Sequence, residues 1–295
     1  MNKVLTIILI VLLSIITIGL AFGLYFMING KFNFKSFENM NFNNVSTNLV
    51  DSKEITTLKD LDIKTNVVDV SIEENNTNTI KVELYSDYPK NYEISENENN
   101  IKIVLDEKKK AGFYVFKKIP KVKVLIPSNY DKNIVINSDV GDIKIEKFPN
   151  ATLNSKLDVG DLKIKQIKDA TADLRVGDIR IDKINSLTSN LKTGDIKIQN
   201  INEIVAIVKT GDVKIDTLNG YINIKSTTGD VKVQNAIINK NSKIDSKIGD
   251  VKINNISGCY VNAKTDVGDT KINNKERKSD IELTITNNIG DIKVY

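Results

Sequence analysis

The residues of this chain best placed to do chemistry are aspartates and basic residues that recur together at a nearly constant spacing. They belong to a six-residue phrase: an apolar or Thr residue, Gly-Asp, an apolar residue (Thr once), Lys or Arg, then Ile or Val. The phrase occurs nine times, and its aspartates are Asp142, Asp161, Asp178, Asp195, Asp212, Asp230, Asp250, Asp269 and Asp291. The bases two residues later are Lys144, Lys163, Arg180, Lys197, Lys214, Lys232, Lys252, Lys271 and Lys293.

Two interpretations of these aspartates are open. Nine carboxylates in one column could bind calcium, as Gly-Asp repeats do in calcium-binding β-rolls. The paired glycines of those repeats are missing, however, and calcium sites need six to eight oxygen ligands with little positive charge nearby. The other interpretation is a surface network. Like charges about 4.8 Å apart repel by about 0.9 kcal/mol in water, and the neighbouring basic column offsets this repulsion. We therefore predict no metal site and no cofactor, and keep the calcium column as the alternative.

Composition argues against catalysis. The chain has no histidine, so it lacks the commonest general base and a frequent metal ligand. Enzymes of the polysaccharide-lyase type, which use parallel β-helices, need one singular cluster of carboxylates and bases, but here every phrase is alike. The 42 basic and 38 acidic residues are interspersed, which is not the basic block of a nucleic-acid-binding protein. We predict a protein that is not an enzyme, has no catalytic residue and binds no nucleic acid.

The glycines of the phrase set the architecture that positions these charges. Successive copies lie 17 to 22 residues apart, and such a period is typical of one supersecondary unit stacked on itself. Glycine is expected where the chain turns sharply or needs a positive φ. The predicted structural turns are Gly141, Gly160, Gly177, Gly194, Gly211, Gly229, Gly249, Gly268 and Gly290.

Each unit should contain two strands joined by a bend. Period-two alternation points Ile143 and Ile145 inward and Asp142 and Lys144 outward. A second alternating run follows, for example Ala170 to Val176. An apolar residue seven after Gly usually separates the two runs: Phe148, Ile167, Ile184, Ile201, Leu218 and Ile256. No stretch has a helical period after the N-terminal span. We predict an all-β fold, a single-stranded parallel β-helix or solenoid with coils of about 17–22 residues, preceded by one N-terminal transmembrane helix.

The two ends of the repeat array look different from its middle. The stretch NVVDVSI, Asn66 to Ile72, resembles a degenerate copy of the phrase. Near the C-terminus Thr270 replaces an aliphatic residue and Lys275 replaces an Ile or Leu, as capping of an open solenoid end requires. Ile292 to Val294 would then be the last strand edge, which could pair with another chain. Cys259 falls on the inward face of its run and is predicted to be a small buried residue.

Composition along the chain gives four segments. Val4 to Ile28 is free of charge and long enough to cross a bilayer, so residues 1–30 are predicted to be a transmembrane signal anchor. A signal peptide cleaved after Gly19-Leu20-Ala21 is the alternative. Residues 31–58 are predicted to be an Asn-rich juxtamembrane linker, 59–140 irregular N-terminal coils that cap the solenoid, and 141–295 the regular Gly-Asp solenoid. A separate small β-domain at 59–140 is the alternative for the third segment.

A hydrophobic N-terminal span, the strand KVKVLIP closed by Pro127 and the serial GDIKI and GDVKI phrases together resemble the bacterial putative-adhesin family of membrane-anchored β-strand-repeat proteins of unknown function. The resemblance covers about residues 60–295. It implies a non-catalytic surface-interaction module of the cell envelope, single-pass in the cell membrane with its C-terminal domain outside the cytoplasm. The partners it implies are the membrane, through the N-terminal helix, and a cell-wall polymer, a surface ligand or a membrane protein. The alternative is a regulatory component of an envelope-stress signalling system that contacts a membrane sensor protein.

Overall fold

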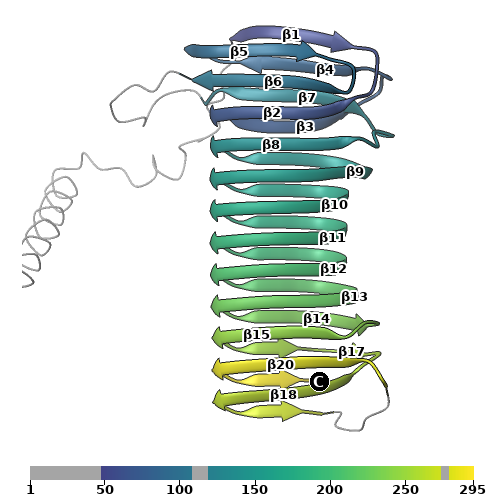
Figure 1. Cartoon of the computed structure of the whole chain (residues 1–295), viewed down its shortest axis with the longest axis vertical. Helices are drawn as coiled ribbons and strands as arrows, with labels where there is room; N and C mark the ends of the chain where they lie inside the picture. The colour runs from purple at the N-terminus through teal and green to yellow at the C-terminus, as the bar shows by residue number, and fades with distance from the viewer. Residues whose placement is uncertain (1–47, 108–118, 274–278) are drawn as a thin grey trace, which may run out of the picture. The chain divides into compact units, whose positions relative to one another are not determined.

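The computed structural model describes residues 48–107, 119–273 and 279–295. Every regular element in these ranges is a β-strand. No helix in these ranges is long and apolar enough to cross a membrane, and the span predicted at Val4 to Ile28 lies outside the described residues. The described strands form a β-solenoid, in which successive coils lie on top of one another (Figure 1).

The middle of the solenoid consists of long strands that each fold over a bend to make one coil. These strands are β9 (Ile143–Val159), β10 (Leu162–Val176), β11 (Ile179–Thr193), β12 (Ile196–Thr210) and β13 (Val213–Thr228). The half that follows Gly-Asp lies on what we call the first face, and the half that leads to the next glycine lies on the second face. Neighbouring coils pair in parallel and in register, with Ile164 opposite Ile181 and Leu174 opposite Leu191. The predicted parallel, in-register stacking of the coils is confirmed.

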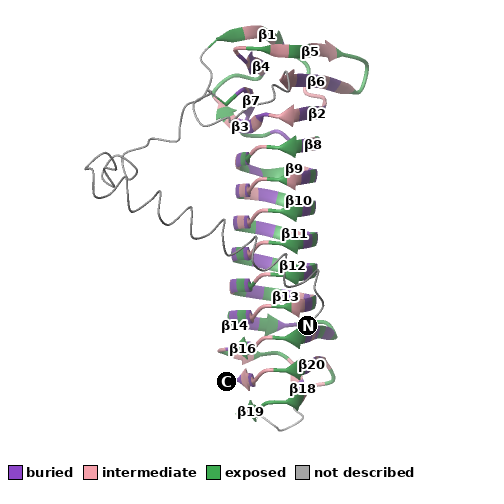
Figure 2. Cartoon of the chain, turned by 90° about the vertical axis from the view of Figure 1, so that its left-hand side faces the viewer, coloured by how far each residue is buried: buried purple, intermediate pink, exposed green. Residues whose placement is uncertain are grey.

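The core is a set of aliphatic columns between the two faces. Ile143 and Ile145 are buried, and charged residues alternate with them on the outside, so that burial alternates along each coil (Figure 2). The apolar residue seven after Gly fills the bend of each of the coils from β9 to β13, beginning with the fully buried Phe148. Burying one such side chain contributes about 1.5–3 kcal/mol. The two halves of one coil cover these side chains only from the two faces, so the burial is complete only when neighbouring coils stack on both sides.

The C-terminal coils do not stack in the order of the sequence. Beyond β13 come β14 (Val231–Ile238) and β15 (Ser242–Ile248), then β16 (Val251–Ile253) and β17 (Ile256–Ser257). The remaining strands are β18 (Tyr260–Val267), β19 (Thr270–Ile272), β20 (Glu282–Ile289) and β21 (Ile292–Val294). Strand β20 pairs with both β15 and β18, and β21 pairs with both β16 and β19. The last coil in sequence, β20–β21, is therefore inserted between β15–β16 and β18–β19, and β18–β19 is the end of the stack (Figure 1).

This order corrects the prediction that Ile292 to Val294 forms the last strand edge. Ile292 and Val294 are 0% and 1% exposed, because coils cover them on both sides. Thr270, in contrast, is exposed on the terminal coil. The polar substitution at Thr270 thus marks the end of the stack in space, one coil before the last phrase in the sequence.

The N-terminal coils show a similar insertion. On the second face β2 (Asp60–Val67) lies between β6 (Asn100–Glu107) and β8 (Asn133–Val140). On the first face β3 (Asp69–Asn75) lies between β7 (Lys121–Pro127) and β9. The resemblance of NVVDVSI to the phrase is confirmed, since Val70 and Ile72 pair with Ile143 and Ile145.

The outermost N-terminal strands depart from the predicted all-parallel pairing. The strands β1 (Leu49–Ile55), β4 (Ile80–Tyr85) and β5 (Pro89–Glu96) make three antiparallel pairs: β1 with β4, β4 with β7, and β5 with β6. Short connections such as residues 97–99 reverse the chain between adjacent strands, which antiparallel pairing permits and parallel pairing does not. Strand β1 also falls inside the linker predicted for residues 31–58, so part of that segment belongs to the sheet.

Candidate functional site: the Gly-Asp corner

The Gly-Asp phrase forms the corner between the second face of one coil and the first face of the next. All nine predicted turn glycines have φ between 132° and 145°, a backbone conformation that side chains other than glycine rarely adopt. The corner is also crowded: a Cβ added to Gly177 would lie 1.8 Å from the carbonyl oxygen of Gly160. Glycine is therefore required both by the turn and by the close approach of neighbouring coils.

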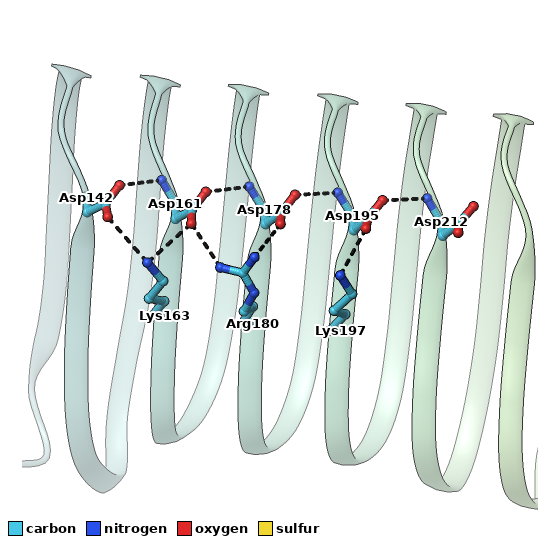
Figure 3. A network of polar contacts seen from close by, with 8 residues as sticks. All are labelled: Asp142, Asp161, Lys163, Asp178, Arg180, Asp195, Lys197 and Asp212. Carbon is cyan, nitrogen blue, oxygen red and sulfur yellow. Dashed lines mark hydrogen bonds and ion pairs between the residues drawn. The ribbon is translucent and has the colours of Figure 1, made fainter. Parts of the chain in front are cut away.

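The aspartates form a hydrogen-bonded column along this corner. In each coil the carboxylate Oδ1 accepts a hydrogen bond from the main-chain N–H of the aspartate in the next coil, at N–O distances of 2.8–3.0 Å (Figure 3). The order in space is Asp69, Asp142, Asp161, Asp178, Asp195, Asp212, Asp230, Asp250, Asp291 and Asp269. The column thus begins with Asp69 of the degenerate phrase and ends at Asp269.

The second carboxylate oxygen of several aspartates pairs with the basic column. Arg180 bridges two coils, with one nitrogen 2.9 Å from Asp161 Oδ2 and the other 2.6 Å from Asp178 Oδ2. Lys163 likewise contacts Asp142 and Asp161, at 3.3 and 3.2 Å. Ion pairs within one phrase are made by Lys197, Lys232 and Lys293, at 3.0, 2.8 and 2.8 Å.

The other predicted bases are less closely tied to the aspartate column. Lys214 is nearer to Asp216, at 3.9 Å. Lys271 Nζ lies 5.5 Å from the ring centre of Tyr295. Lys144 and Lys252 form no ion pair within the ranges that the structure describes. The basic column is therefore continuous in position but only partly paired.

The electrostatics of the corner favour ionised carboxylates. The N–H of Asp212 is the main cause that lowers the pKa of Asp195, and the N–H of Asp269 does the same for Asp291. The hydrogen bond from Lys232 is the main cause that lowers the pKa of Asp230. Asp69 is the exception, because its burial raises its pKa.

The arrangement uses the carboxylates to join coils. Each Oδ1 from Asp69 to Asp291 along the column is occupied by an amide hydrogen, and many Oδ2 atoms face an ammonium or guanidinium group. No group of three or more His, Cys, Asp or Glu side chains that could hold a metal ion occurs in the described part of the chain. Because the carboxylate oxygens already accept hydrogen bonds and form ion pairs, the geometry favours the surface-network interpretation, with backbone hydrogen bonds as a component that the charge pattern did not reveal.

Cys259 lies at the C-terminal end of the core. Its side chain is half-buried against the core cluster, and burial raises its pKa to about 11. The thiol is therefore protonated at neutral pH, and a thiol is a much weaker nucleophile than a thiolate. These properties agree with an apolar packing residue.

A polar column inside the C-terminal coils was missed by the sequence pattern. Ser226, Ser246 and Asn287 stack in register three residues before their glycines, where the middle coils have Leu or Val. All three are buried, and Ser226 Oγ, Ser246 Oγ and Asn287 Oδ1 have no hydrogen-bond partner. The alternation alone could have placed these residues inward.

A family model and several solved structures resemble the chain. The model of the family described as Toastrack DUF4097 matches residues 58–295. A putative adhesin from Bacteroides fragilis is 15% identical, with a TM-score of 0.45 over 85% of this chain and 98% of that one. A putative lipid binding protein from Parabacteroides distasonis has the same identity and TM-score over 83% and 97%. A putative adhesin from Parabacteroides merdae is 15% identical, with a TM-score of 0.35 over 84% and 97%. No curated protein matches the chain.

Proposed function

The chain belongs to the Toastrack DUF4097 family, and we propose that it serves as a non-catalytic interaction module of the bacterial cell surface. In this proposal residues 1–30 anchor the chain in the cell membrane and the solenoid lies outside the cytoplasm. Its ligand is then a cell-wall polymer or another surface ligand. The uncharged stretch Val4 to Ile28 supports the anchor.

The observation that carries the proposal is that the carboxylates of the aspartate column already bind main-chain N–H groups and basic side chains of neighbouring coils. Residues that could act as acids, bases or ligands recur in every coil, and the corner geometry uses them to hold neighbouring coils together. What the solenoid then offers a partner is a long surface of repeated charges at a fixed spacing. Such a surface suits binding to a polymer better than it suits chemistry on one small molecule.

A binding experiment on the full chain tests this function. We expect the chain to sediment with purified cell walls or to bind surface polymers, and binding should weaken as salt rises because the exposed columns are charged. Consistent absence of binding to cell walls, matrix and host ligands would remove the proposal.

Crosslinking in intact cells separates this function from the regulatory alternative. Recovery of a surface polymer supports the interaction module. Recovery of a membrane sensor protein, together with altered stress-regulon expression on deletion of the chain, supports the regulatory role instead.

A further inference from the structure

The last coil of the stack, β18–β19, is paired on one side only among the described strands. Strand β18 pairs with β20 and β19 pairs with β21, and no described strand lies on the other side of either. Gly268 is accordingly exposed, whereas the other eight turn glycines are half-buried. The open side of this coil is therefore a free sheet edge.

The free edge repeats a hydrogen-bonding pattern that is satisfied in the other coils. There the Gly N–H donates to the carbonyl that precedes the glycine of the next coil, as Gly177 does to Thr193 at 3.0 Å. The residue after Asp donates to the carbonyl of the next Asp, as Ile179 does to Asp195 at 2.8 Å. The Asp Oδ1 accepts the N–H of that same next Asp, as Asp178 does from Asp195 at 2.9 Å.

On the last coil the same three groups have no counterpart in the described part of the chain. They are the N–H of Gly268, Oδ1 of Asp269 and the N–H of Thr270. The hydrogen bond from Ile292 N–H to the Asp269 carbonyl fixes the register, so the Thr270 N–H points away from β21. Donor, acceptor and donor thus stand in a row, at the spacing that a parallel strand with a Gly-Asp corner would satisfy.

A cavity lies beside this edge at the opposite bend. The apolar bend column runs through Leu218 and Ala236 to Ile256, and beyond Ile256 it is continued by an opening of about 380 Å³. Its lining includes Ile256, Cys259, Val261, Ile272, Val294 and Tyr295. The end of the stack therefore combines unpaired main-chain groups with space for an apolar side chain.

The N-terminal end of the stack is built differently. Its outermost strands pair antiparallel, and both carry a bulge, between Leu49 and Asp51 in β1 and between Pro89 and Asn91 in β5. Bulges and proline at an edge disfavour the addition of a further strand. β18 and β19 contain neither, so the two ends differ in their readiness to pair.

We propose that the β18–β19 end is a docking site for an extended segment of a partner polypeptide that carries the same Gly-Asp phrase. The segment adds as one more parallel strand, as in β-augmentation. Its Asp N–H binds Asp269 Oδ1, its carbonyls accept from Gly268 and Thr270, and its bend residue lies on the same side of the stack as the cavity. The edge identifies the partner because Gly268, Asp269 and Thr270 offer the same two N–H donors and one carboxylate acceptor that every other coil offers to the Gly-Asp phrase of the next coil. The proposal deepens the function proposed above by naming a partner class, and it rests on that function.

A peptide from this chain provides the probe. Residues 205–218, VAIVKTGDVKIDTL, contain a second-face run, the corner and the bend residue Leu218. Fluorescence anisotropy of the labelled peptide with the full chain should give saturable binding. The peptide with Gly211→Ala should not bind, because in the stack a Cβ at this position meets the preceding coil's carbonyl oxygen at 1.8 Å. The peptide with Leu218→Asp should bind more weakly.

Variants of the full chain locate the site. Thr270→Pro removes an edge donor and should abolish peptide binding, and Asp269→Ala should weaken it about tenfold through the lost charge-assisted hydrogen bond. Asp266→Ala is the matched control, because it removes a neighbouring exposed carboxylate that pairs only with Lys264. It should change binding less than twofold. Circular dichroism verifies the fold of each variant.

The outcomes separate this proposal from its rivals. Equal binding to all variants, or no binding at about 1 mM peptide, overturns it. Self-association of the full chain that Thr270→Pro abolishes makes a second copy the occupant and also overturns it. Failure of the peptide while cell-wall binding persists removes this docking site and leaves the proposed function standing.

Discussion

The coils β10 to β12 and the terminal coil β18–β19 are built on the same phrase, yet they use different residues inside it. Three residues before glycine the middle coils have Leu174, Leu191 and Val208, all fully buried. The terminal coil has Thr265 there, and Thr270 where the middle coils have Ile or Leu. In the coils between them this position is held by the buried Ser226, Ser246 and Asn287. The column therefore first becomes polar where coils still cover it on both sides, and it becomes partly exposed only at the coil that is open on one side.

The largest test of this comparison concerns the corner glycines. Gly194→Ala places a Cβ 2.0 Å from the carbonyl oxygen of Gly177. The coils on either side of this corner are paired on both faces, so they cannot move apart without breaking hydrogen bonds to their other neighbours. We expect a loss of about 4 kcal/mol or more in the free energy of unfolding, measured with urea. Gly268→Ala also meets a carbonyl, at 2.4 Å, but the terminal coil can shift outward, so its loss should be smaller. Equal losses would contradict the comparison.

The core column gives the next effect. Leu174→Ala removes a fully buried side chain and should cost about 2–5 kcal/mol of unfolding free energy, including the cavity left behind. Thr265→Ala should cost less than about 1 kcal/mol, because its side chain is half-exposed and its one hydroxyl hydrogen is shared between the carbonyls of Gly290 and Val267. A loss at Thr265 as large as that at Leu174 would show that the terminal coil is as tightly packed as the middle.

The aspartate column should show the same gradient. Asp195→Ala leaves the N–H of Asp212 without its acceptor and should cost about 1–3 kcal/mol in urea unfolding. Asp269→Ala removes an Oδ1 that accepts from no described group, so stability should change by less than about 0.5 kcal/mol. If the two variants were equally destabilised, the carboxylates would act through charge alone.

Two buried serine hydroxyls should respond in opposite directions when serine is replaced by alanine, because only one of them has a hydrogen-bond partner. Ser246 Oγ is buried without a partner, so Ser246→Ala should leave stability unchanged or raise it by about 1 kcal/mol. Ser138 Oγ accepts from Thr65 Oγ1 at 2.9 Å, and Ser138→Ala should lower stability by about 1 kcal/mol. Thermal melts of the pair measure this contrast, and a clear loss at Ser246 would indicate a partner such as an ordered water.

The smallest effect per residue is the dependence on pH. The pKa values of Asp161, Asp195, Asp230 and Asp291 are lowered by folding. Their stabilisation is therefore complete above the unfolded pKa of about 4 and is lost as pH falls through the folded values. Asp69 opposes this, because its pKa is raised. The melting temperature should fall between about pH 4 and pH 2, and an unchanged value would contradict the assignment.

Much of the coil could be predicted from the sequence, because each strand repeats its own period. Alternation placed Ile143 and Ile145 inside, and the invariant position of Gly177 and its equivalents marked the corner. The order of stacking could not be predicted. Every phrase offers the same hydrogen bonds, so β21 fits on β16 as well as β19 would, and local pattern does not distinguish them.

The corner itself was only half predicted. Charge spacing indicated that aspartates and bases offset one another, and Arg180 between Asp161 and Asp178 agrees with this. The bond from each carboxylate to the next coil's amide depends on how closely the corners approach, which no single phrase reveals. The terminal coil was flagged by Thr270, but its place at the end of the stack follows from the insertion of β20–β21.

The insertion of β20–β21 means that the coils cannot assemble in the order in which they are synthesised. A chain that emerges from its N-terminus cannot complete the stack coil by coil, because the place between β15 and β18 is filled by residues synthesised after β18. Until β20 and β21 arrive, β18–β19 must wait or occupy their place and later yield it. The last segment of the chain therefore acts as a closing step, and a protease that removes it would separate β18–β19 from every coil on which it rests.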